Sequence, residues 1–406
     1  MTRSLFRLLT QRKTLLVVGI GLALLVLYYG TIGTGGQISK SIDGCLQEGP
    51  KKQQCLDTLI LGEARRGGVS HAFDVLAEIY PRDTEFALFC HGNTHQLGEL
   101  AFDSFEKGED AAISPKTSYC GFGFYHGFLE KLVYTKGDLS EARLFCEHVD
   151  EKLRGTVSGG SFACYHGIGH GVVDGTDPSR WGDAEKYIEP GLALCEKVSD
   201  IQEEKARCAS GVFNALAIVL HKGEHGFSAT LTDPYSICKE QKLPYVRKSC
   251  YDQMNSYIVE TTDTFSDALN MAASHAEPAL VTVAISSVAG YTAQEALGST
   301  SPLTTYLGAC DKLSSSLRDV CAKGFASGLI EFGNPDKEYG KAIALCVQGG
   351  ERTNACLRGV IDGAQYRLGP DALEAFCAEV GRAAGASAER ECRDIIERNS
   401  SSGSLL

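Results

Sequence analysis

Several short motifs that would identify a familiar chemistry are missing from this chain. It holds sixteen cysteines, yet no Cys-x-x-Cys occurs, which argues against thiolate zinc ribbons, iron–sulfur clusters, thioredoxin-type chemistry and haem attached through Cys-x-x-Cys-His. His-Glu-x-x-His and Gly-x-Ser-x-Gly are also absent, so neither a zincin-type protease nor a serine hydrolase with a nucleophile elbow is supported. Haem held non-covalently by two histidines stays open as the less favoured alternative.

The chain also has no excess of basic side chains. Of its 406 residues, 39 are Lys or Arg and 51 are Asp or Glu, which gives a net charge of -12. A nucleic-acid-binding surface needs a basic stripe to neutralise phosphates, so we expect no nucleic-acid partner. The acidic balance fits an extracellular surface, and the length allows either one large core or an extended repeat array.

One long uncharged run lies near the amino terminus. It extends from Thr14 to Gly30 and follows four basic residues. About 17 to 20 apolar residues suffice to cross a bilayer, and a positive flank stays in the cytoplasm. A cleaved signal peptide is the alternative, but its hydrophobic part is only roughly 7 to 15 residues long. We therefore expect an uncleaved, single-pass signal anchor with the following domain extracytoplasmic, so that the membrane is one partner and an envelope protein a possible second.

The even number of cysteines agrees with that compartment, because thiols in an exported chain form disulfides. Most fall into couples 10 to 18 residues apart, the distance from the end of one helix into the start of the next. Sequence alone does not fix connectivity, and pairing by neighbour is our prediction. The eight predicted pairs are Cys45–Cys55, Cys90–Cys120, Cys146–Cys164, Cys195–Cys208, Cys238–Cys250, Cys310–Cys321, Cys346–Cys356 and Cys377–Cys392.

Alignment on the second cysteine of each couple reveals an internal repeat. Glycine follows three residues later and a small residue seven residues later, as in Cys120, Gly123 and Gly127. The cysteines at 120, 164, 208 and 250 are 44, 44 and 42 residues apart, and those at 321, 356 and 392 are 35 and 36 apart. Such a period is typical of a solenoid of helix pairs, and a stripe of small residues indicates close approach of a neighbouring helix. The expected fold is an all-α, disulfide-stapled α/α solenoid.

Units such as Lys341 to Leu368, with an Ala-rich first helix, a cysteine couple and glycines, resemble Sel1-like repeats, which are TPR-related helix pairs. The resemblance covers Gly137 to Cys392, and it implies an α/α superhelix with a role in binding. The chain departs from that family because its cysteine couples are wider and more variable and its His-rich segments have no counterpart there. The resemblance implies nothing about the histidines.

These patterns divide the chain into four parts. Residues 1–36 form the cytoplasmic tail, membrane anchor and spacer. Residues 37–235 form the His-bearing repeats, residues 236–398 form repeats without such histidines, and the Ser-rich residues 399–406 form a disordered tail.

Five histidines and three carboxylates form matching layers in three segments of the front half. If each segment is helical, residues at steps of four share one face, and neighbouring helices of a solenoid lie close enough for them to converge. The eight candidate metal ligands are His91, His95, Glu99, His126, Glu130, His166, His170 and Asp174. This set suits zinc, iron, copper or manganese and makes calcium or magnesium poor choices. One ion with orienting carboxylates and two ions are both open.

Comparison with the other repeat units supports the histidines as metal ligands more strongly than the carboxylates. Glu260 and Glu331 occupy the same repeat position as Glu130 in units without such histidines, so an acidic residue there belongs to the repeat as readily as to a site. The histidines are confined to the front units. The first hypothesis is therefore a metal-dependent oxidoreductase or hydrolase, or metal capture. The second is a non-enzymatic interaction scaffold in the cell envelope with a structural histidine cluster.

Overall fold

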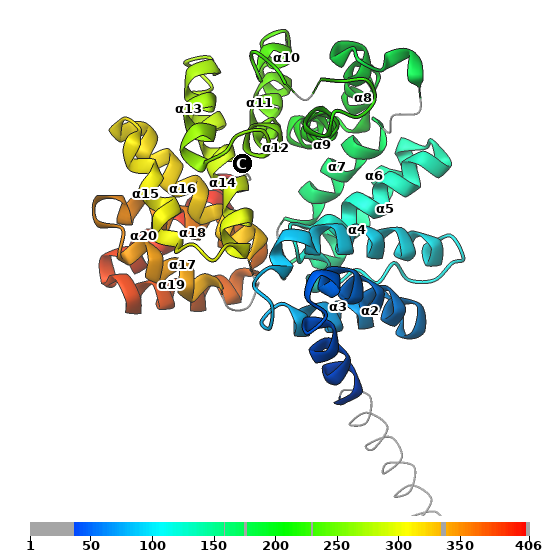
Figure 1. Cartoon of the computed structure of the whole chain (residues 1–406), viewed down its shortest axis with the longest axis horizontal. Helices are drawn as coiled ribbons and strands as arrows, with labels where there is room; N and C mark the ends of the chain where they lie inside the picture. The colour runs from blue at the N-terminus through cyan, green and yellow to red at the C-terminus, as the bar shows by residue number, and fades with distance from the viewer. Residues whose placement is uncertain (1–35, 158, 174–176, 229, 334–337, 403–406) are drawn as a thin grey trace, which may run out of the picture.

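The computed structural model describes residues 36–157, 159–173, 177–228, 230–333 and 338–402, and every regular element in these ranges is a helix (Figure 1). The predicted all-α class is thus confirmed. The helices of the front half are α2 (Lys52–Gly67), α3 (Val69–Ile79), α4 (Phe86–Phe105), α5 (Gly123–Lys136), α6 (Leu139–Leu153), α7 (Gly160–Gly171), α8 (Ala184–Val198) and α9 (Gln202–Lys222). Those of the rear half are α10 (Ser236–Lys239), α11 (Pro244–Gln253), α12 (Asn255–Glu260), α13 (Phe265–His275), α14 (Val281–Gly298), α15 (Leu303–Ala309), α16 (Ser315–Phe332), α17 (Glu338–Val347), α18 (Thr353–Arg367), α19 (Pro370–Ala384) and α20 (Ala386–Ser402).

An inner row of helices surrounds a central cavity of about 700 Å³. The row consists of α4, α5, α7, α9, α11 with α12, α14, α16 and α18, and each of these packs against the next along the chain. Helix α14 also packs against α4, which brings the rear half back to the front half (Figure 1). Helices α6, α8, α13 and α17 form an outer layer, and each packs against the inner helix that follows it. All members of the inner row contribute residues to the wall of the cavity.

Two outer helices, α6 and α8, begin at residues whose side chains satisfy free backbone amides. Asp138 accepts a hydrogen bond from the Ser140 amide at the start of α6, and Asp183 does the same for the Lys186 amide in α8. Such N-caps stabilise a helix by about 1 kcal/mol. At the other end, Gly137 closes α5 with a φ of 62°, in the left-handed region that glycine adopts without steric cost.

Every one of the eight predicted cysteine couples is joined by a disulfide, and the described residues contain no free cysteine. Four of the bonds join an outer helix to the inner helix that follows it, as Cys146 in α6 joins Cys164 in α7. Cys90–Cys120 instead ties α4 to the turn before α5. Each of these five bonds therefore fixes the rotation of an inner helix about its axis, and with it the direction of the side chains that follow the cysteine.

The stripe of small residues lies where the inner helices touch, as its spacing predicts. A Cβ built on Gly127 in α5 would overlap the carbonyl oxygen of His95 in α4, and one built on Gly211 in α9 would overlap that of His166 in α7. Any larger residue would push these helices apart. The glycines thus bring the backbones of the His-bearing helices close enough for their imidazoles to meet.

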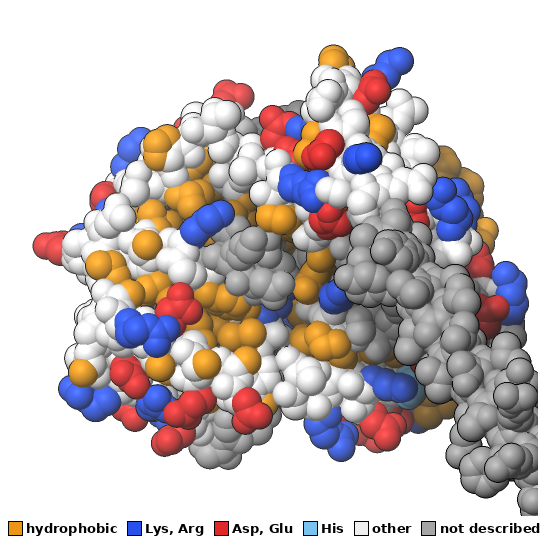
Figure 2. Space-filling view, turned by 90° about the horizontal axis from the view of Figure 1, so that it is seen from below, with side chains coloured by type: hydrophobic (Ala, Val, Ile, Leu, Met, Phe, Trp, Pro, Cys, Tyr) orange, Lys and Arg blue, Asp and Glu red, His pale blue; other side chains and the backbone are white. Residues whose placement is uncertain are grey.

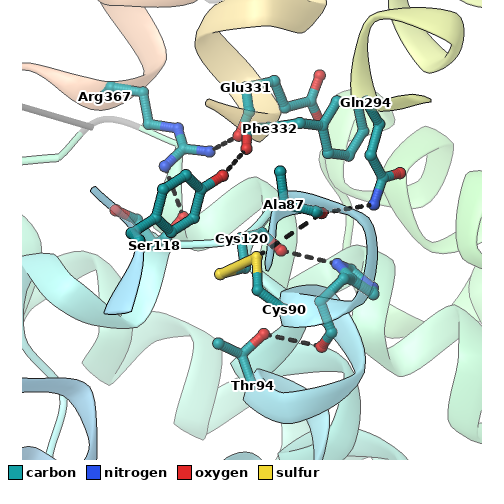
Figure 3. The surroundings of a disulfide bond; sticks show 11 residues. Ala87, Cys90, Thr94, Ser118, Cys120, Gln294, Glu331, Phe332 and Arg367 are labelled. Atoms are coloured by element: carbon teal, nitrogen blue, oxygen red, sulfur yellow. Dashed lines mark hydrogen bonds between the residues drawn. A yellow bond between two sulfur atoms is a disulfide. The ribbon is translucent and has the colours of Figure 1, made fainter. Parts of the chain in front are cut away.

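Polar contacts fasten the rear half to the front half. Arg367 at the end of α18 donates a hydrogen bond of 2.7 Å to the carbonyl oxygen of Ser118 and another to that of Glu331 (Figure 3). Gln294 in α14 donates to the carbonyl oxygen of Ala87 in α4 across 3.4 Å. These long-range contacts hold the inner row around the cavity.

The structure tests the prediction for the carboxyl-terminal tail but not the prediction for the amino-terminal anchor. The proposed anchor, Thr14 to Gly30, lies outside the described residues, and none of the helices within them is both long and apolar enough to span a bilayer. At the other end, α20 continues to Ser402, so the first residues of the tail predicted to be disordered are helical, because serine weakens a helix only slightly. On the face seen from below, acidic and basic side chains are interspersed around an apolar area (Figure 2).

Candidate metal centre

Three adjacent inner helices bring the five predicted histidines together. α4 carries His91 and His95, α5 carries His126, and α7 carries His166 and His170. One ligand atom from each of His91, His95 and His126 lies within 4.8 Å of the others, and the same holds for His126, His166 and His170. The structure therefore contains two histidine triads that share His126, here called the five-histidine cluster.

His126 occupies the centre of the cluster. Its ring centroid lies 5.0 Å from that of His91, 5.3 Å from that of His95 and 4.8 Å from those of His166 and His170. His126 and His170 are buried, and the other three are partly buried. Because His126 belongs to both triads, the five side chains form a single site.

Hydrogen bonds on the far side of two rings fix which nitrogen faces the centre. The Nδ1 of His91 lies 2.8 Å from the carbonyl oxygen of Cys120, and a carbonyl only accepts, so this Nδ1 carries the proton. The Nδ1 of His166 lies 2.7 Å from the hydroxyl of Ser210, which itself donates to the Arg207 carbonyl. That hydroxyl must accept from His166. Both rings therefore keep the Nε2 lone pair for another partner.

Glu130 orients the other two outer rings of the cluster. One of its carboxylate oxygens lies 3.2 Å from the Nδ1 of His170, and the other lies 3.5 Å from the Nδ1 of His95. A carboxylate behind an imidazole fixes the tautomer and raises the basicity of the opposite nitrogen, which is how proteins prepare histidine to bind metals. Glu130 thus orients two imidazoles, one from each triad, and is not itself a member of either triad.

Two Nε2 atoms face each other in the second triad. Those of His166 and His170 are 3.2 Å apart. The Nδ1 atoms of both rings are engaged elsewhere, so in the neutral state two lone pairs point at one region. Two imidazole ligands of one tetrahedral zinc ion, each bound at 2.0–2.1 Å, have nitrogens about 3.3 Å apart. The spacing therefore matches that of two ligands of one metal ion.

Burial favours, for four of the five imidazoles, the neutral form that a metal ion requires. It lowers the pKa of His95 to about 3 and holds the pKa values of His126 and His166 well below their usual value. The pKa of His91 is also lowered, first by burial and then by the neighbouring His170. For Glu130, burial raises the pKa, but the hydrogen bond from His170 and the other neighbouring imidazoles together outweigh it, so that the pKa is lowered and the group is a carboxylate. The cluster is thus rich in neutral nitrogen donors.

One buried polar atom in the cluster has no partner. The Nδ1 of His126 is enclosed and makes no hydrogen bond to the described residues. A buried polar atom left unpaired costs about 1–3 kcal/mol, and a bound ion or water is one way in which such an atom is satisfied. The central ring of the cluster is therefore the one whose environment is incomplete without a bound group.

The two remaining predicted ligands do not join the triads. Glu99 is exposed, and neither triad includes it, because α4 extends one turn beyond His95 and carries Glu99 to the surface. Asp174 lies outside the described residues.

His221 and His225, which are also four residues apart, join no triad either. The Nδ1 of His225 lies 3.3 Å from the hydroxyl of Tyr187, and its ring stacks on Trp181 at 4.9 Å.

Two partners of the cluster were not predicted as such. Ser210 occupies the position of His166 in the next repeat unit. The structure shows that its hydroxyl is the hydrogen-bond acceptor for His166. The second partner, the backbone carbonyl of Cys120, has no sequence signature at all, because any residue supplies that oxygen.

The cluster also forms part of the wall of the central cavity. His91, His126 and His166 line the cavity, whereas His95, His170 and Glu130 stand behind them. The arrangement can hold a transition metal in the wall and leave a coordination position for a small molecule. Comparison with known proteins found no matching family model, no similar curated protein and no similar solved structure, so the resemblance to Sel1-like repeats stays a prediction.

Proposed function

We propose that this chain is a membrane-anchored, extracytoplasmic α-helical repeat protein that binds a transition metal in its five-histidine cluster. The observation that carries the proposal is the 3.2 Å separation of the Nε2 atoms of His166 and His170. When both rings are neutral and both Nδ1 atoms are bonded elsewhere, neither Nε2 has a proton to offer the other. The two Nε2 lone pairs then repel each other, and a cation bound between them would be coordinated by both.

The donor set narrows the choice of metal. Glu130 uses its two oxygens on the Nδ1 atoms of His95 and His170, which leaves imidazole nitrogens as the donors within the triads. Imidazole suits zinc, copper and iron, whereas manganese prefers oxygen ligands. We therefore favour zinc, copper or iron over manganese.

The position of the cluster favours a metal that acts on a small molecule. A catalytic metal keeps one coordination position open, and His91, His126 and His166 line a cavity of about 700 Å³. An oxidoreductase with copper or iron, or a hydrolase with zinc, fits this arrangement. The extracytoplasmic location rests on the eight disulfides, which persist in oxidising compartments, and on the uncharged run near the amino terminus.

Metal analysis of the purified full chain tests this proposal. After incubation with zinc, copper or iron and removal of excess ion, the wild type should retain one or two ions per chain. A variant with His126→Ala and His170→Ala should retain none, because it breaks both triads, whereas His275→Ala in α13 should retain the wild-type amount. A folded wild type that retains none of the three metals would disprove the metal site.

A second candidate is a non-enzymatic interaction scaffold. It is favoured by one observation: four of the five histidines have a partner for Nδ1 within the protein, so they can serve as structural hydrogen-bonding groups. The unpaired Nδ1 of His126 speaks against it. The same metal analysis separates the two candidates.

A further inference from the structure

Beyond the histidines, the wall of the central cavity is rich in uncharged polar groups. Five carboxamides line it, each of which both donates and accepts hydrogen bonds. They are Gln53, Asn214, Gln253, Asn255 and Gln294. Four serine hydroxyls, on Ser256, Ser286, Ser287 and Ser327, line it as well. Gln253, Asn255 and Gln294 each use one atom within the protein. The other polar atoms of this wall can pair with a ligand that carries many groups able both to donate and to accept.

Aromatic rings share the wall with these polar groups. The rings belong to Phe89, Phe122, Phe162, Tyr291, Phe332 and Tyr366. Aromatic faces pack against apolar surface and attract the slightly positive C–H groups of a ligand. The ligand that fits must therefore present hydroxyl-like groups at its edge and C–H groups on its face.

The charged side chains in this wall are balanced. Arg207 and Arg367 carry positive charge, and Asp252 and Glu331 are the acidic residues. Burial raises the pKa values of both acids. It is opposed in part by the charge of Arg207 for Asp252, and by the charges of Arg367 and Arg207 for Glu331. The wall outside the cluster thus has no surplus charge to attract a strongly ionic ligand.

The two guanidinium groups are already engaged by the protein. Arg367 donates to the Ser118 carbonyl and lies over the ring of Phe122 at 4.8 Å. Arg207 lies over the ring of Phe162 at 5.1 Å, with a nitrogen 3.5 Å from the hydroxyl of Tyr366. An anionic ligand would have to compete with these contacts as well as with the two acids.

We infer that the central cavity binds a neutral, hydroxyl-rich small molecule of the size of a mono- or disaccharide. Cavities of roughly 300 to 1,000 Å³ hold such ligands, and this one measures about 700 Å³. Each sugar hydroxyl donates and accepts, as carboxamides and serines require, and a pyranose presents C–H groups on its faces. The inference deepens the proposed function, and rests on it for the chemistry, because a hydroxyl beside His126 would be the group presented to the metal.

Calorimetric titration of the full chain with glucose, maltose and sucrose tests the inference. The protein is kept in a detergent without a sugar headgroup, once metal-free and once loaded with zinc. Glucuronic acid and glucosamine serve as the charged counterparts of glucose. We expect at least one neutral sugar to bind both forms, and each charged counterpart to bind at least tenfold more weakly than glucose.

Two variants locate the binding. Asn214→Leu, which keeps the branched shape but removes the carboxamide from the wall, should weaken binding at least tenfold. Asn354→Leu, on the exposed surface of α18, should not change it. Sugar binding by a protein that holds no metal would leave this inference standing while the proposed function fails. Binding of none of the sugars to either form, tighter binding of a charged counterpart, or equal binding by the Asn214→Leu variant would overturn it.

Discussion

His91 and Cys120 are joined twice. The Nδ1 of His91 donates to the carbonyl oxygen of Cys120 across 2.8 Å, and Cys120 is bonded through sulfur to Cys90, the residue before His91. The disulfide holds in place the carbonyl that orients the imidazole. Cys120 and Phe122 have φ values of 56° and 60°, a left-handed conformation that non-glycine residues rarely adopt, so the turn depends on such fastening.

Removal of that disulfide should therefore weaken metal binding. We expect a Cys90→Ser, Cys120→Ser double variant to bind zinc about 10- to 100-fold more weakly, the range found when a group that orients a metal ligand is lost. Competition with a coloured chelator measures the affinity. The matched control is Cys377→Ser with Cys392→Ser, which removes the bond between α19 and α20. Equal losses in the two variants would show that the effect is one of general stability.

Glu130 offers a second test of orientation. Glu130→Gln keeps the shape but removes the charge that holds two Nδ1–H groups, and we expect a similar 10- to 100-fold loss of zinc affinity. Glu260→Gln is the control because Glu260 occupies the same repeat position in a unit without the cluster. Its zinc affinity should equal that of the wild type. If both variants bind zinc normally, Glu130 belongs to the repeat and not to the site.

The contacts of this site that lie within one helical turn could be predicted from the sequence. The contacts between segments far apart in the chain could not. Steps of four residues placed His91 with His95, and His166 with His170, because helix geometry acts over one turn. The cysteine couples predicted seven of the eight pairings because these bonds close loops of 10 to 18 residues. Cys90 and Cys120, 30 residues apart, remained as the eighth pair. Nothing local relates Ala87 to Gln294, and the closure of the inner row around a cavity was accordingly not foreseen. Glu99 was included because spacing alone does not say where a helix leaves its neighbours.

The glycine contacts predict opposite effects for two substitutions. Gly127→Ala should lower the free energy of unfolding by about 1–3 kcal/mol, because the new Cβ would overlap the His95 carbonyl oxygen. Gly92→Ala, in α4 with no atom within 4 Å of its built Cβ, should raise it by about 0.5–1 kcal/mol through better helix propensity. Urea unfolding with the disulfides intact measures both. Two stabilised variants would mean that α4 and α5 do not touch at Gly127.

The neutral histidines predict that the metal-free protein loses stability in mild acid. The pKa of His95 is about 3 in the folded state because of burial, whereas an unfolded histidine has a pKa of about 6.5. Between these values the unfolded chain takes up a proton that the folded chain does not, so the free energy of unfolding falls as the pH falls below about 6.5. Above that pH, His95 makes no pH-dependent contribution. His91, His126 and His166 act in the same direction.

Urea unfolding of the EDTA-treated protein at pH 7.5 and at pH 5.5 measures this loss. Histidines titrate in this pH range, whereas most carboxylates titrate at lower pH. His95→Asn should lose about 1 kcal/mol less than the wild type between the two pH values. The control, His275→Asn, changes a partly exposed ring outside the cluster and should follow the wild type. Identical pH dependence in all three proteins would mean that the folded chain protonates His95 as readily as the unfolded chain does, and the burial of the cluster would then be wrong.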